Sequence, residues 1–415
     1  MLVAADRKLA NTPGTSCTFE VLAGQRLHRP VLPMLRRSTI GVSFDRTGLV
    51  LSRGRWRLGS DSGVPMLLTY DVAMDEKARP MRFGLYDLVE ARPGVGLDRL
   101  YRERFELIAA AEDAGLWGYH TTEHHLTPLD ATPSPSLFLA AAAQHTSTIR
   151  LGSLVHVLPL YEPIRLAEEL LMLDALTGGR LEIGFGKGVS SPEQRLLGRE
   201  PDARDANMDD VLEQVLSILR GEPVDGAPIP FRPVQKPYPP LWYAGNADYA
   251  GRHNLHVVLG GSADRIIENA HLHKQTAAAH ADDPSRLNPD PVPTTAFSRH
   301  VLVDTDRDRA RRRAIEAWKA YDHNITTHFR RLGEPRQSNP TLDGDGERAI
   351  EQGLLAAGDP DDVAANLVQV AALSPVDYSL ASFCWGSLDH AEAMASLELF
   401  VTQVMPRVQA ALAGG

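Results

Sequence analysis

Short apolar runs alternate along most of this chain with longer segments in which apolar residues recur at every third or fourth position. Short runs bounded by Gly, Pro or polar turn residues indicate strands, and the longer period indicates helices with one buried face. From Met81 onward, predicted strands cover residues 82–87, 117–122, 149–158, 180–185, 241–244, 256–259, 294–303 and 378–383. Predicted helices cover residues 97–114, 134–145, 163–176, 207–220, 263–281, 307–331, 361–373 and 390–412.

The order of these elements determines the fold class that we expect. Eight predicted strands alternate with helices, and helical connections favour parallel strand pairing in one α/β sheet. With 415 residues, the chain is long enough for such a sheet to close into a (β/α)8 TIM barrel. Residues 332–358 are rich in Gly, Asp, Pro and Arg and lack helix signals, so we expect a loop insertion near the barrel mouth.

The first 80 residues differ in composition from the rest. They carry twelve Lys/Arg and seven Asp/Glu, a net charge of +5, whereas residues 81–415 carry 31 and 46, a net charge of −15. Apart from a hairpin signal over residues 39–58, they lack sustained periodicity. We expect residues 1–80 to be a poorly ordered N-terminal extension or a mis-assigned start, and residues 81–415 to form the barrel domain.

Two other functions are conceivable for the first segment, but its residues fit neither well. Arg36-Arg37 resembles a twin-arginine export signal, but Asp45 and Arg46 interrupt the apolar run that such a signal needs. A basic arm that binds nucleic acid would be expected to carry more aromatic residues for base stacking. We therefore favour the extension.

Composition and charge narrow the function classes for the whole chain. The hydrophobic fraction of 43% and the charged fraction of 23% are ordinary for a globular protein, and no apolar run approaches the ~20 residues of a membrane-spanning helix. The only two cysteines, Cys17 and Cys384, are far apart in sequence, which favours a reducing cytoplasm. The net charge of −10 argues against a nucleic-acid partner.

Chemistry-bearing residues follow two of the predicted strands. The strand 117–122 leads into Glu123-His124-His125, and the strand 180–185 leads into the glycine-rich turn Gly186-Lys187-Gly188. Glycines let the backbone approach a ligand closely, and the lysine supplies a positive charge. Because parallel barrels place their active sites at the carboxyl ends of the strands, both groups are expected at one barrel mouth.

Several motifs in order resemble those of a known family. From Met81 onward the chain resembles the bacterial luciferase-like family of flavin-dependent monooxygenases. The resemblance covers residues 81–415 and rests on the opening Met81-Arg82-Phe83-Gly84-Leu85-Tyr86, on Glu123-His124-His125, on Leu158-Pro159 with the segment 163–168, on the segment 173–188, and on Val404-Met405-Pro406.

The resemblance implies a catalytic role for the histidine-rich motif. His124 occupies the position of an imidazole near the reactive edge of the flavin, where it can exchange a proton or donate a hydrogen bond. Glu123 and His125 are expected to belong to the same catalytic group, in part by orienting His124. A zinc site is the alternative, but the motif lacks the helical spacing of zinc-protease histidines and shows no third ligand, so no metal is expected.

The resemblance also implies a set of cofactor-binding residues: Tyr86, Leu154, Val155, Gly186, Lys187, Gly188, Gly245 and Asn246. Leu154-Val155 matches a bulge that presses on the flavin ring in relatives, sometimes through a non-proline cis bond. Lys187 stands where relatives often carry arginine, and Gly186 stands where some carry a reactive cysteine. Gly245-Asn246 matches the turn that cradles the flavin phosphate, but Asp248 nearby would repel a phosphate if its carboxylate faced inward.

The function implied is transfer of one oxygen atom from O2 to a small organic substrate, using reduced FMN supplied by a separate NAD(P)H flavin reductase. A homodimer is expected, with the predicted helix 134–145 as a candidate interface. Two alternatives remain open on the same barrel: hydride transfer with the deazaflavin cofactor F420, and a catalytically silent partner subunit.

Overall fold

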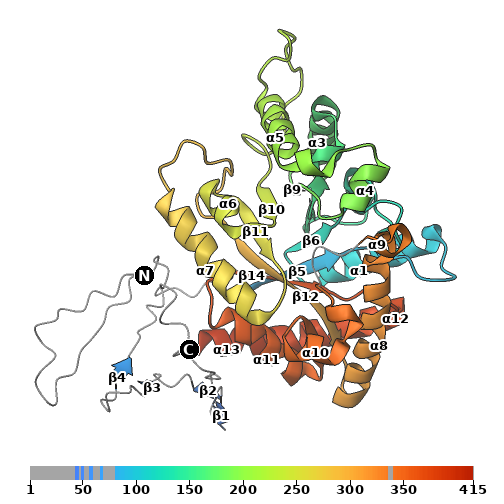
Figure 1. The fold of residues 1–415 in the computed structure, drawn as a ribbon, viewed down its shortest axis with the longest axis vertical. Coiled ribbons are helices and arrows are strands. Elements are labelled where there is room, and N and C mark those ends of the chain that lie inside the picture. Colours follow the sequence, from blue (N-terminus) through green and yellow to red (C-terminus); the bar gives the residue numbers. More distant parts are fainter. Residues whose placement is uncertain are drawn as a thin grey trace, which may run out of the picture. The chain divides into compact units, whose positions relative to one another are not determined.

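The computed structural model describes residues 80–334 and 340–414, together with four short strands between residues 43 and 68. The chain divides into two compact units, of which Pro80–Leu412 is by far the larger (Figure 1). In the N-terminal unit, β1 (Ser43–Asp45) pairs antiparallel with β2 (Gly48–Val50), within the predicted hairpin 39–58, and β3 (Trp56–Leu58) pairs with β4 (Met66–Leu68). The Arg36-Arg37 motif lies outside the described residues, as does most of the predicted extension.

The larger unit contains a closed barrel of parallel strands, as predicted. Strand β5 pairs with β6 on one side and with β14 on the other, and the pairing of β9 with β10 completes the circle. The eight barrel strands are β5 (Arg82–Asp87), β6 (Gly118–Thr121), β7 (Arg150–Ser153), β9 (Leu181–Gly186), β10 (Leu241–Ala244), β11 (His256–Leu259), β12 (Thr295–Val303) and β14 (Tyr378–Ser382).

Helices follow the strands in the order that the apolar periodicity predicts. The longer helices around the barrel are α1 (Leu97–Asp113), α2 (Pro135–Ala142), α3 (Pro163–Leu176), α5 (Arg204–Arg220), α7 (Ala263–Ala279), α8 (Arg307–Ile325), α11 (Pro360–Ala371), α12 (His390–Leu399) and α13 (Met405–Ala413). A π-helical turn, η6 (Phe400–Val404), joins the last two. Among the described residues, no helix is both long enough and apolar enough to cross a membrane.

The third strand was predicted to be continuous over residues 149–158, but in the structure it is divided. It is split into β7 and β8 (His156–Val157), and a 3-10 turn, η3 (Leu158–Leu160), follows. The peptide bond between Leu154 and Val155, which lie between the two pieces, is cis. Because both pieces pair with β9, the strand keeps its place in the barrel, although Leu154 and Val155 themselves form no register pair with β9.

Residues 332–358 were predicted to form a loop without a helix, but the structure has regular elements there. It contains η5 (Leu342–Gly344), α10 (Gly346–Glu351) and β13 (Leu355–Gly358), and β13 pairs with the end of β12. Helix α10 is capped by Asp345, whose side chain accepts a hydrogen bond from the Arg348 amide. A helix this short shows too little periodicity to be recognised in sequence.

Two further short helices, α4 (Ser191–Leu196) and α6 (Ala247–Arg252), were missing from the prediction for the same reason. The predicted helix 307–331 is divided at Thr326 into α8 and α9 (Thr327–Leu332). Helices α4 and α6 follow β9 and β10 directly, at the carboxyl ends of these strands. They therefore contribute to the barrel mouth.

A buried cluster inside the barrel supports the mouth from below. It contains Leu154, Trp242, Ala296, Tyr378 and Leu380, with Tyr86 and Val155 packed against it. Space for Tyr378 depends on glycine, because a Cβ at Gly84 would lie 1.9 Å from the Tyr378 hydroxyl. The residues between the two pieces of the third strand thus rest on a packed interior.

Candidate active site

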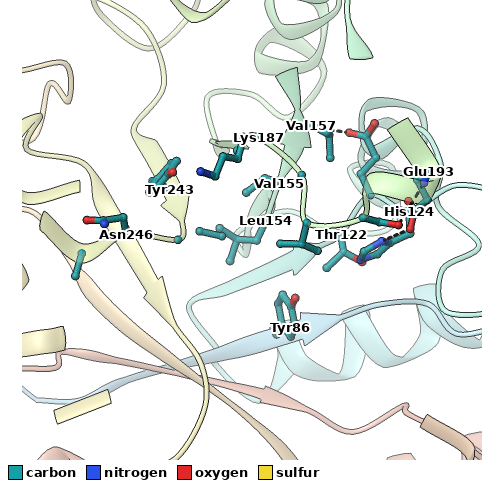
Figure 2. Close-up of a pocket in the computed structure, with 18 of the residues that line it drawn as sticks. Tyr86, Thr122, His124, Leu154, Val155, Val157, Lys187, Glu193, Tyr243 and Asn246 are labelled. Atoms are coloured by element: carbon teal, nitrogen blue, oxygen red, sulfur yellow. Dashed lines mark hydrogen bonds and ion pairs between the residues drawn. The ribbon is translucent and has the colours of Figure 1, made fainter. Parts of the chain in front are cut away.

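A cavity of about 560 Å³ opens at the carboxyl ends of the barrel strands (Figure 2). This volume lies within the roughly 300–1,000 Å³ of small-molecule and cofactor sites. The cavity is lined by Tyr86, Thr122, Glu123, His124, Leu154, Val155, Val157, Leu160, Gly186, Lys187, Gly188, Val189, Ser190, Glu193, Gln194, Tyr243, Ala244, Gly245, Asn246, Ala247, Asp248, Arg265, Asn269 and Leu272. Of the residues selected from the sequence, only His125 does not line it.

The two ends of the cavity differ in chemistry. Figure 2 shows Lys187, Tyr243 and Asn246 at one end and His124 with Glu193 at the other, with Leu154 and Val155 between them. One end therefore presents a cation and backbone turns, the middle is apolar, and the other end carries titratable groups.

Glu123 fixes the histidine-rich motif to the third strand. One carboxylate oxygen accepts hydrogen bonds from the Val157 amide at 2.8 Å and the Tyr161 hydroxyl at 2.9 Å, and the other accepts from His125 Nε2 at 3.0 Å. The carboxyl group is buried. Glu123 and His125 thus hold the loop, which leaves His124 as the histidine of the motif at the cavity.

His124 has a partner that the sequence did not reveal. Its Nδ1 lies 3.1 Å from Glu193 Oε1, and the other oxygen of Glu193 accepts a hydrogen bond from the His125 amide at 2.9 Å. Burial lowers the pKa of His124, but the Glu193 charge and hydrogen bond outweigh it, so that the pKa is raised from its ordinary value. Burial acts to raise the pKa of Glu193. The His124 charge and the hydrogen bonds from His124 and the His125 amide together outweigh burial, so that the pKa of Glu193 is lowered from its ordinary value.

A sequence signal for Glu193 exists in retrospect. Ser190 and Glu193 have the Ser-x-x-Glu spacing of a helix start, and the Ser190 hydroxyl does accept a hydrogen bond from the Glu193 amide. The Glu193 carboxylate, however, reaches across to His124 and His125. The spacing indicates where α4 begins but not where this side chain points.

The glycine-rich turn packs tightly against the third strand. A Cβ at Gly186 would lie 3.0 Å from a Val155 methyl group, and one at Gly188 would lie 2.8 Å from a Val157 methyl group. Gly188 also has φ +76°, a conformation that disfavours other residues. The Lys187 carbonyl accepts a hydrogen bond from Gln194 Nε2 at 2.7 Å, which joins the turn to α4.

A second cation, Arg265 on the first turn of α7, also lines the cavity and was not predicted. On β10, the turn at Gly245 has φ +153°, and Asn246 caps α6 by accepting a hydrogen bond from the Tyr249 amide. Asp248 lines the cavity too, but its carboxylate accepts hydrogen bonds from Arg252 Nε at 2.9 Å and the Thr276 hydroxyl at 3.0 Å. These partners offset the repulsion of an anion that its sequence position suggested.

The described residues contain no group of three or more His, Cys, Asp or Glu side chains arranged to hold a metal ion. Glu193 completes the surroundings of His124 through a hydrogen bond instead. The cavity lining therefore combines a titratable imidazole, His124, with two cationic side chains, Lys187 and Arg265.

Several known proteins are similar to this chain in sequence. The family model described as luciferase-like monooxygenase matches residues 81–376. The chain is 29% identical to the uncharacterized protein y4wF of Sinorhizobium fredii over 343 residues, which cover 79% of this chain and 97% of the relative. It is 27% identical over 306 residues to the oxygenase component of the flavin-dependent trigonelline monooxygenase of Acinetobacter baylyi, covering 69% of this chain and 78% of that protein.

Solved structures share the fold. Monooxygenase RslO1 of Streptomyces bottropensis superposes with a TM-score of 0.66 at 23% identity, covering 79% of this chain and 99% of that chain. The oxygenating constituent of 3,6-diketocamphane monooxygenase from Pseudomonas putida, in complex with FMN, gives 0.64 at 19% identity, covering 80% and 99%. The F420-dependent tetrahydromethanopterin reductase of Methanopyrus kandleri gives 0.58 at 20% identity, covering 80% and 100%.

Proposed function

The chain belongs to the family of luciferase-like monooxygenases, and we propose that it uses reduced FMN and O2 to transfer one oxygen atom to a small organic substrate. The observation that carries the proposal is the change of chemistry along the cavity, from Lys187 and Asn246 across Leu154 and Val155 to His124 (Figure 2); Arg265 adds a second cation to its lining. A flavin mononucleotide has the same sequence of parts: a phosphate, an apolar ring system and a reactive edge that exchanges protons.

The residues present fit this cofactor. Lys187, Arg265 and the turn Gly245-Asn246 would hold the phosphate, and Leu154, Val155 and Tyr86 would contact the ring and exclude water from it. When bound, reduced FMN supplies two electrons to O2, of which one atom enters the product and the other leaves as water.

The contribution of the chain itself is centred on His124. Its raised pKa keeps the imidazole protonated nearer to neutral pH, so that Nε2–H can donate a hydrogen bond or a proton into the cavity while Nδ1–H is held by Glu193. Glu123 and the His125 ring keep the loop in place and are positioning residues in this account.

The partners follow from the same proposal. A reductase that supplies reduced FMN is supported by the relative that is the oxygenase component of a flavin-dependent monooxygenase. We also propose a homodimer, because Leu137 on α2 and Ile164 and Met172 on α3 expose apolar side chains on two helices that contact each other. A reducing cytoplasmic location is proposed from the cysteine content alone.

An isotope experiment tests the reaction. The chain would be incubated with FMN, NADH, a separate flavin reductase, 18O2 and candidate substrates, and products would be analysed by mass spectrometry. One 18O atom per product molecule is expected, with loss of product in His124→Ala. Substrate turnover with reduced F420 and without O2 would instead assign hydride transfer, and binding of neither cofactor would assign a silent subunit.

A further inference from the structure

The loop that carries His124 leaves the barrel at Thr122 and returns to the same place at Thr132. Asp130 lies where the two ends meet and is buried, with 4% of its surface exposed. One of its oxygens accepts a hydrogen bond from the Thr122 hydroxyl, and the other accepts from the Thr132 amide at 2.6 Å. The Thr132 hydroxyl also donates to Asp130. A single carboxylate thus closes the neck of the loop.

Neighbouring contacts show that the neck is part of the barrel wall. Thr121, the last residue of β6, has its hydroxyl 3.1 Å from that of Thr132, and its carbonyl accepts a hydrogen bond from the Leu154 amide at 2.6 Å. The Ala131 amide donates to the Val89 carbonyl at 3.1 Å. Thr122 itself lines the cavity (Figure 2). The position of His124 therefore depends on bonds that converge on Asp130.

The charge of Asp130 also acts on His124. Three carboxyl groups raise the pKa of His124: first Glu193, then Asp130, then Glu123. In return, the His124 charge lowers the pKa of Asp130, although burial dominates and raises it to about 6. The Asp130 charge also raises the pKa of Tyr86 on β5 and of Tyr101 on α1, in both cases after burial. Neither tyrosine carries a positive charge, whereas the His124 charge acts to lower the pKa of Asp130.

We propose that Asp130 is a positioning residue of the site: its carboxylate joins the two ends of the loop that carries His124, and so holds the imidazole beside Glu193 at the cavity. The proposal rests on the proposed function and deepens it, because that reaction depends on His124 facing the cavity. A buried carboxylate that is costly to ionise contributes little to stability by itself, which is typical of groups retained for a site.

The substitution Asp130→Asn separates the two roles. An asparagine keeps the shape and can still accept hydrogen bonds from Thr132 through Oδ1, but it removes the charge. We expect the pKa of His124 to fall, because one of the negative charges that raise it is removed. The unfolding midpoint should be kept or raised at pH 8, because the cost of burying a charge is removed.

Substitutions of Thr122 test the same proposal without replacing Asp130 itself. Its hydroxyl donates to Asp130 and so favours the ionised carboxyl group, which Thr122→Val removes and Thr122→Ser restores. We expect Thr122→Val to raise the pKa of Asp130 and to lower that of His124 in the same direction as Asp130→Asn but by less. Thr122→Ser should resemble the wild type.

The measurement is an NMR titration of the full chain labelled with 13C in histidine, with the His124 signal assigned by its loss in His124→Gln. It needs no flavin, so it can fail or succeed independently of the proposed reaction. A lower His124 pKa in Asp130→Asn and Thr122→Val, with Thr122→Ser unchanged, supports the proposal. An unchanged His124 pKa in folded Asp130→Asn overturns it, and if that variant does not fold, an unchanged value in Thr122→Val does so.

Discussion

Glu193 Oε1 lies 3.1 Å from His124 Nδ1, although the two residues are 69 positions apart in sequence. The same carboxylate accepts a hydrogen bond from the His125 amide, so it orients the ring and holds the backbone of the motif. Because Nδ1 is engaged, Nε2 is the atom through which His124 can act in the cavity.

This pair predicts a pH dependence of stability. Since the folded-state pKa of His124 is raised, the contribution of the charged pair is fully present below about pH 6.5 and is lost as the pH rises through the folded value. Urea unfolding should show that Glu193→Gln lowers the free energy of unfolding more at pH 6 than at pH 9. Glu169→Gln, which removes an exposed ion pair with Arg165 on α3, serves as the control and should change little at either pH. An equal loss at both pH values for Glu193→Gln would contradict the pairing.

The cationic end of the cavity predicts selective effects on phosphate binding. Lys187→Ala and Arg265→Ala should each weaken FMN binding by roughly tenfold or more, because each removes a charge-assisted contact. Riboflavin, which lacks the phosphate, should bind these variants about as it binds the wild type. Equilibrium fluorescence titration measures both ligands. Arg102→Ala on α1, at an exposed pair, is the matched control, and equal losses for riboflavin would place the phosphate elsewhere.

Alanine substitutions at two glycines distinguish the cost of a left-handed backbone from the cost of a steric clash. Gly188 and Gly198 have similar φ angles, +76° and +71°, but a Cβ at Gly188 meets Val157 and Gln194 whereas one at Gly198 meets nothing within 4 Å. Gly198→Ala should therefore cost about 1–2 kcal/mol of unfolding free energy from the left-handed backbone alone. Gly188→Ala should cost more and should also weaken flavin binding. Equal unfolding midpoints for the two variants would show that the turn tolerates a side chain.

The exposed apolar side chains of α2 and α3 predict that a charge placed among them weakens self-association. Met172→Glu should convert the proposed dimer to a monomer at micromolar concentration, because an unpaired carboxylate would have to be buried in the interface. Light scattering coupled to size-exclusion chromatography gives the mass. Leu97→Glu, at an exposed apolar position on α1, is the control. A wild-type monomer, or a dimer that survives the Met172 change, would rule out this face.

Much of the fold could be predicted because its signals are local. The bounds of β5, β10, β11 and α3 in the structure are those predicted from apolar runs and from Pro163 at a helix start. The division of the third strand could not be predicted from periodicity, because Leu154 and Val155 are apolar whether or not they join the ladder. Only their likeness to a family motif pointed to an irregularity.

The site divides in the same way. Residues at strand ends, such as His124 and Lys187, could be selected because barrel topology places strand ends at one mouth. Glu193 and Arg265 lie on helices that follow those ends, and their direction depends on tertiary packing. Asp130 belongs to neither class, because its role depends on a loop returning to its own start. The catalytic assignments themselves stay predictions.

The most direct test of the central claim is an anaerobic equilibrium titration of the full chain with reduced FMN, alongside reduced F420 under the same conditions. The account predicts saturable binding of one reduced FMN per chain, weakened in Lys187→Ala and Arg265→Ala. Admission of air to the saturated wild-type protein should then oxidise the flavin at a rate that changes in His124→Ala. Failure to bind reduced FMN, or tight binding of F420 alone, would contradict the account.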